Sequence, residues 1–133
     1  SQTDGLGGGD AYFTPDFMVH YLAWAQTQKW YPDFYRGLPV LGVDGTLFNI
    51  QVDAPAKGRV HAKTGTWGGG NSLSRGGIIT AKGLVGYTTT RSGRRVAFAL
   101  YLNNMLAGRN QDGGHIAGQV LGEIANAIYL YAK

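Results

Sequence analysis

The sequence predicts an α+β fold in which helices flank an antiparallel sheet. Two amphipathic helical patterns lie near the ends of the chain, over about 15–28 and 113–131, and strand-like patterns fill much of the region between them. Helices that are separated from a run of strands favour this architecture over a parallel one. With 133 residues, 44% of them hydrophobic, the chain is long enough for one modest core, so we expect one domain or part of one over residues 1–133.

Both helices carry start signals. Thr14 is placed to cap the first helix, with Pro15 at the first helical position, and apolar residues then recur at helical spacing: Phe17, Met18, Tyr21, Leu22 and Ala25. Asp112 is placed as a cap or first-turn acid for the second helix. There the residues expected to form one apolar face are Ile116, Val120, Leu121, Ile124 and Ile128.

Strands are expected over 59–64, 77–80, 84–90 and 96–103, the last two pairing as a hairpin about the turn at 91–95. Three prolines in 29–57 predict a loop-rich connection there. The glycine-rich segment 67–74 is interpreted as a flexible flap beside a binding cleft, and 75–83 as an added strand or hairpin.

Composition excludes several classes of function. The net charge is +4, but the basic residues are scattered, so we expect no nucleic-acid partner. The chain has no cysteine, which excludes disulfides and thiolate chemistry. No apolar run approaches the ~18 residues of a membrane span. None of the three histidines has a second ligand at metal spacing, and neither glycine-rich segment completes a phosphate loop, so no metal or cofactor is expected.

The stretch Lys63-Thr64-Gly65-Thr66 at the end of a short strand combines a cation, two hydroxyls and a glycine. A lone Lys-Thr-Gly is a weak signal, because a lysine at a strand end is often only a solvated edge residue. Here Val60 and Ala62 are expected to face one side of the strand and His61 and Lys63 the other. An extended peptide ending in a carboxylate could add along such an edge, where Gly65 leaves room for a second backbone. For His61 itself, a structural role is favoured over that of a general base.

Three blocks in order carry a resemblance to a known family: Leu38 to Leu47, Gly58 to Thr66, and Ala97 to Asn104. Together they resemble the C-terminal part of the D-alanyl-D-alanine carboxypeptidase/endopeptidase family of low-molecular-mass class C penicillin-binding proteins. Asp4-Gly5 to Thr14-Pro15 also resembles the family's Asp-Gly-Ser-Gly-Leu-Ser to Thr-Pro passage, with glycines replacing the serine and the polar residues after it. The fold implied is the C-terminal portion of the penicillin-binding protein/β-lactamase-like transpeptidase fold.

The resemblance implies a serine-type acyl-transfer mechanism on peptidoglycan stem peptides, with β-lactam antibiotics as inhibitors. By motif, Lys63, Thr64 and Thr66 would bind the terminal carboxylate of a D-Ala-D-Ala peptide, and the backbone N–H of Thr66 would be one oxyanion-hole donor. Gly65 and Trp67 belong to the same expected substrate-binding stretch. The implied catalytic residues on this chain are Lys63 and Thr66.

The family's nucleophile lies in a Ser-x-x-Lys motif, and none of the four serines of this chain is followed by a lysine at that spacing. The chain is therefore expected to be the substrate-binding half of the enzyme, inert until it associates with a complementary N-terminal half or with itself. Its expected location is extracytoplasmic, with the signal peptide outside these residues. Two alternatives stay open: a non-catalytic module that binds peptidoglycan peptides, and a β-lactamase or esterase relative.

Overall fold

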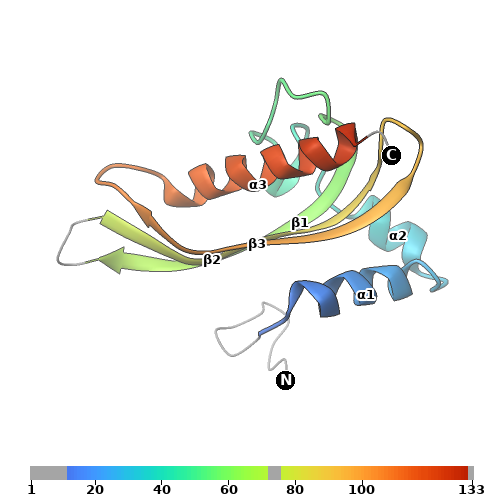
Figure 1. Ribbon diagram of the computed structural model, residues 1–133, viewed down its shortest axis with the longest axis horizontal. Helices are drawn as coiled ribbons and strands as arrows, with labels where there is room; N and C mark the ends of the chain where they lie inside the picture. The colour runs from blue at the N-terminus through green and yellow to red at the C-terminus, as the bar shows by residue number, and fades with distance from the viewer. Residues whose placement is uncertain (1–11, 72–75, 132–133) are drawn as a thin grey trace.

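The computed structural model describes residues 12–71 and 76–131, and in them a twisted antiparallel sheet lies between helices (Figure 1). The sheet has the strand order β1-β2-β3, and the α+β prediction is confirmed. Helix α3 covers one face of the sheet, and α1 and α2 lie on the other (Figure 1). In chain order the elements are α1 (Pro15–Ala25), α2 (Tyr31–Arg36), the 3-10 helix η1 (Gly45–Leu47), β1 (Val60–Asn71), β2 (Gly76–Thr89), β3 (Arg95–Ala107) and α3 (Gly113–Leu130).

Both predicted helix starts are confirmed. The side-chain oxygen of Thr14 accepts a hydrogen bond from the backbone N–H of Phe17 at 3.1 Å, and that of Asp112 accepts one from His115 at 2.9 Å. Helix α1 ends at Ala25, three residues earlier than predicted. Thr27 donates its hydroxyl to the carbonyl of Trp24 at 2.7 Å, and this local bond helps to end the helix there.

The strands are longer than predicted, and two segments were assigned wrongly. Residues 77–80 and 84–90 were expected as separate strands, but β2 runs without a break from Gly76 to Thr89 because it pairs with β1 on one side and with β3 on the other. Residues 67–71 of the expected flap belong to β1, and 72–75 lie outside the described residues. The region 29–57, expected to be loop-rich, also contains α2 and η1.

Helix α3 packs on the sheet through small residues rather than through the predicted isoleucine face. Its buried residues are Gly113, Ala117, Gly118, Leu121, Gly122 and Ala125. Of the predicted face Leu121 is buried and Ile128 is half-buried against the core, whereas Ile116, Val120 and Ile124 are 39%, 40% and 42% exposed. Gly118 and Gly122 both lie against Ile50, where an added Cβ would come within 3.1 Å of Ile50 side-chain atoms. The helix thus approaches the core closely and leaves an apolar strip, Ile116, Val120 and Ile124, facing outward.

A second cluster of buried residues, centred on Leu22, Leu38 and Tyr87, holds α1 and α2 against the opposite face. The buried hydroxyl of Tyr87 donates to the carbonyl of Leu22 at 2.8 Å, which ties β2 to α1. The outer surface of α1 and the turn after it carries a series of neighbouring exposed rings, which we term the aromatic stripe: Phe13, Phe17, Tyr21, Trp24 and Trp30.

Candidate functional site

The predicted site lies on β1, which is an edge strand of the sheet formed by the described residues. The carbonyl of Val60 accepts from Leu41 N at 3.0 Å, and the amide of Ala62 donates to Pro39 O at 2.9 Å, so these two residues point their backbone groups away from β2. Backbone direction alternates along a strand, and the pairing of β1 with β2 is regular up to Trp67. The N–H and C=O groups of Thr64 and Thr66 therefore also point away from β2. The segment 39–41 covers this edge of β1 at Val60 and Ala62, and Thr64 and Thr66 lie further along the strand.

The ammonium group of Lys63 lies at this same edge. Its Nζ donates to the carbonyl oxygen of Thr64 at 2.7 Å, and that carbonyl points outward. The side chain starts from the face of the sheet that carries α1 and α2, opposite to the face of Val60 and Ala62, and is exposed. The structure thus places a cation on the Thr64 carbonyl, at the edge to which the backbone groups of Thr64 and Thr66 point.

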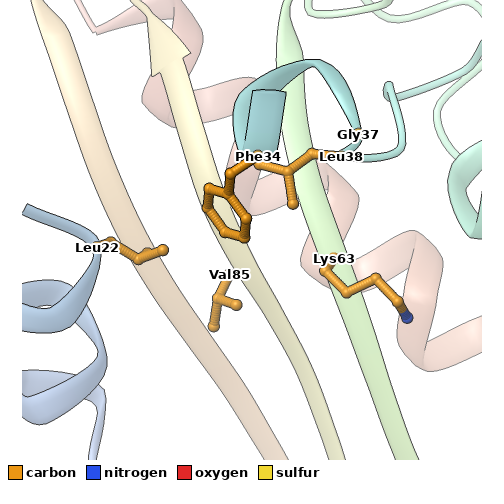
Figure 2. Close-up of a pocket in the computed structure, with 6 residues that line it drawn as sticks. All are labelled: Leu22, Phe34, Gly37, Leu38, Lys63 and Val85. Atoms are coloured by element: carbon orange, nitrogen blue, oxygen red, sulfur yellow. The ribbon is translucent and has the colours of Figure 1, made fainter. Parts of the chain in front are cut away.

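The stem of Lys63 lines a cavity of about 340 Å³ between the sheet, α1 and α2. Figure 2 shows Phe34 and Leu22 converging on Val85 at the apolar end, whereas the Lys63 side chain extends away from them with its nitrogen at the far end. The other lining residues are Gly37 and Leu38. Apolar side chains therefore lie beside the Lys63 stem, and the ammonium group lies at the edge of the cavity.

Thr64 and Thr66 project their side chains to the opposite face, on the side of α3, with Val60 and Ala62. The Thr64 hydroxyl donates to the hydroxyl of Thr46 in η1 at 2.9 Å. The Thr66 oxygen accepts from Nζ of Lys82 in β2 at 2.7 Å. Sequence reasoning missed Lys82, because its position opposite Thr66 follows only from the β1–β2 register.

Gly65 and Trp67 differ in what surrounds them. A Cβ at Gly65 would meet no described atom within 4 Å, so nothing in the described chain requires glycine there. Trp67 is 58% exposed and lies next to a shift in register between β1 and β2. The surface of β1 at Gly65 and Trp67 is therefore open, and this is where the sequence predicts that substrate binds.

His61 is half-buried, and its ring stacks on that of Tyr35 with centroids 4.2 Å apart. Burial lowers the pKa of His61, opposed by the backbone of Tyr35 and by the charge of Asp44. The buried Nδ1 atom has no hydrogen-bond partner in the described structure. His61 also lines a polar cavity of about 410 Å³ with Arg59, Arg91 and five further residues: Tyr35, Gly58, Thr89, Thr90 and Tyr129.

Among residues 12–71 and 76–131, no three His, Cys, Asp or Glu side chains gather closely enough to hold a metal ion. In the same part of the chain no helix has both the length and the apolar character needed to cross a membrane.

Comparison with known proteins identifies the family. The sequence profile of the D-Ala-D-Ala carboxypeptidase 3 (S13) family matches residues 4–122, which is most of the chain. The chain belongs to this S13 carboxypeptidase family. The match includes all of β1, β2 and β3, and the predicted resemblance to D-Ala-D-Ala carboxypeptidases is confirmed.

Two similar proteins are longer than this chain. It is 37% identical over 87 residues to the penicillin-sensitive carboxypeptidase A of Dictyostelium discoideum, covering 63% of this chain and 16% of that protein. It also resembles the crystal structure of penicillin binding protein 4 from Haemophilus influenzae, with a TM-score of 0.64 and 24% identity, covering 89% of this chain and 24% of the other. The structural likeness confirms the penicillin-binding-protein fold. The S13 chain thus spans about a sixth and about a quarter of these two proteins.

Proposed function

We propose that the free edge of β1 at Thr64 and Thr66 binds the carboxylate end of a peptidoglycan stem peptide ending in D-Ala-D-Ala. The observation that supports this most strongly is that the Lys63 ammonium binds the outward-facing carbonyl of Thr64, at the same edge to which the backbone N–H groups of Thr64 and Thr66 point. A peptide that adds to an exposed edge gains backbone hydrogen bonds, and a cation beside them favours a carboxylate.

The residues of the site then take separate roles. Lys63 places positive charge near the terminal carboxylate, and Thr64 and Thr66 supply hydrogen bonds. The N–H of Thr66 is one oxyanion-hole donor, and loss of such a donor costs about 3 kcal/mol of transition-state stabilisation. Gly65 leaves room for the peptide backbone, and Trp67 covers the bound substrate from the side.

We further propose that the chain is the substrate-binding part of a serine-type carboxypeptidase or endopeptidase. In the reaction, a serine attacks the carbonyl carbon of the D-Ala-D-Ala bond, the terminal D-Ala leaves with a proton on its amine, and water hydrolyses the acyl-enzyme. The serine comes from a Ser-x-x-Lys segment outside these 133 residues, because no serine of this chain has that spacing. β-Lactams acylate the same serine, and the reaction takes place outside the cytoplasm, where peptidoglycan lies.

Surfaces on three sides support association with such a complementary segment or with a second copy. Within the described residues β3 pairs only with β2, so its other edge carries unpaired backbone groups. The aromatic stripe on α1 and the apolar strip on α3 are also exposed. Exposed apolar surface of this kind marks a contact with another protein or segment.

Labelling with a fluorescent penicillin tests the proposal. The chain is assayed alone and together with the upstream Ser-x-x-Lys segment encoded with it or co-purifying with it. Covalent label on the complementary segment, reduced at least tenfold by Lys63→Met, supports the proposal, whereas label that does not depend on Lys63 contradicts it. A monodisperse, well-folded monomer in light scattering contradicts the need for association.

The missing Ser-x-x-Lys spacing also favours a second candidate, a non-catalytic module that binds D-Ala-terminated peptides. Peptide binding without any label, even with the complete encoded protein, supports that module. Rapid release of opened β-lactam would instead indicate a β-lactamase relative.

A further inference from the structure

Lys82 lies directly across from Thr66 in the register of β1 and β2. Because Thr66 points its backbone groups away from β2, the two residues form a pair without mutual backbone hydrogen bonds, and side chains approach most closely in such pairs. The Lys82 Nζ atom is 2.7 Å from the Thr66 oxygen. The stem of Lys82 is half-buried beside α3, where a Cβ at Gly118 would lie 3.9 Å from the Lys82 Cε.

This contact decides what the hydroxyl of Thr66 can do. A lysine ammonium only donates hydrogen bonds, whereas a threonine hydroxyl has one proton and two lone pairs. Thr66 must therefore accept from Lys82, which leaves its own proton for another acceptor. The corresponding proton of Thr64 is already donated to Thr46, so the two threonines are not equivalent.

We propose that Lys82 is a positioning residue that orients the Thr66 hydroxyl to donate to the anionic end of a ligand at the free edge of β1. Its ammonium adds a second positive charge to that of Lys63. This inference rests on the proposed function and deepens it, because it makes the site selective for a negatively charged peptide end.

The charges around Lys82 are consistent with such a role. Burial beside α3 lowers the pKa of Lys82, Asp112 opposes that shift, and the like charge of Lys63 adds to it. Lys63 and Lys82 approach β1 from opposite faces and repel each other while no anion is bound. A carboxylate at the edge interacts favourably with both charges, so part of its binding depends on Lys82.

The test uses the purified chain, together with any chain that co-purifies with it, and two probes: N-acetyl-D-alanyl-D-alanine and its C-terminal amide. Binding is measured by NMR titration for wild type, Lys82→Met, Lys82→Arg and Thr66→Val. Lys29→Met is the matched control, because it removes one charge from an exposed lysine in the turn between α1 and α2. Far-UV circular dichroism and a melting curve show that each variant folds.

For the acid probe we expect Lys82→Met to weaken binding about fivefold, Lys82→Arg to restore most of it, and Lys29→Met to leave it unchanged. Thr66→Val should weaken binding of the acid probe by a similar factor. Lys82→Met should weaken binding less in the Thr66→Val variant than in wild type, because the two residues act together. Binding of the amide probe should barely depend on Lys82.

Two results overturn this role of Lys82. Equal binding of the acid probe by wild type and folded Lys82→Met removes Lys82 from the site while leaving the proposed function standing. Equal losses for the acid and the amide show a structural role only. Failure of wild type to bind the acid at all overturns the proposed function and this inference together.

Discussion

Two glycines of the same sheet, Gly65 in β1 and Gly86 in β2, should respond very differently to the same substitution by alanine. At Gly86 the new Cβ would lie 2.6 Å from both Cα and Cβ of Ala62, where ordinary contact is 3.4–4 Å. The clash is with the neighbouring strand, which cannot move aside cheaply, so Gly86→Ala should destabilise the fold by about 2–3 kcal/mol. At Gly65 the Cβ meets nothing within 4 Å, so Gly65→Ala should be neutral or stabilising by about 0.5 kcal/mol.

Urea unfolding followed by circular dichroism measures both changes in the free energy of unfolding. Fluorescent-penicillin labelling of this chain together with its Ser-x-x-Lys segment then reports on the site. Gly65→Ala should slow labelling about tenfold, because the new methyl group occupies the space for the substrate backbone. If Gly65→Ala destabilised the chain as much as Gly86→Ala, the fold itself would require glycine at 65. The open space beside Gly65 would then not be reserved for a ligand.

Two further perturbations test the surroundings of the site. Tyr87→Phe removes the 2.8 Å hydrogen bond to the Leu22 carbonyl and should cost about 1–2 kcal/mol in urea unfolding, while an unchanged midpoint would show that this bond contributes nothing. His61 has its pKa lowered by burial, so between that lowered value and 6.5 the unfolded chain binds more protons than the folded one. Stability should therefore fall as the pH falls through this window, and His61→Gln should remove that dependence; a pH profile identical in both proteins would contradict the burial of His61.

The starts of α1 and α3 were predictable because helix-capping signals are local. The caps at Thr14 and Asp112 depend on residues within one helical turn, and both are found as predicted. The sheet class and the facing of Val60 and Ala62 follow from alternation alone. The family could also be inferred, because its motifs are contiguous stretches of sequence.

Other features depended on tertiary packing. The buried face of α3 is made of Ala117, Gly118, Gly122 and their neighbours because the helix approaches Ile50 closely, and hydrophobic spacing favoured the larger isoleucines instead. Short α2 lies in a region whose prolines predicted a loop, although Pro32 is compatible with the first turn of a helix. Lys82 joins the candidate site through a cross-strand register that no local pattern specifies.

The outward-facing backbone of β1 is tested most directly by mapping backbone amide NMR shifts during titration with N-acetyl-D-alanyl-D-alanine. The proposed function predicts the largest shifts at the amides of Thr64 and Thr66, with smaller ones at His61 and Gly65, whose amides face β2. Shifts concentrated instead at the polar cavity lined by Arg59 and Arg91, or no shift at millimolar peptide, would contradict it.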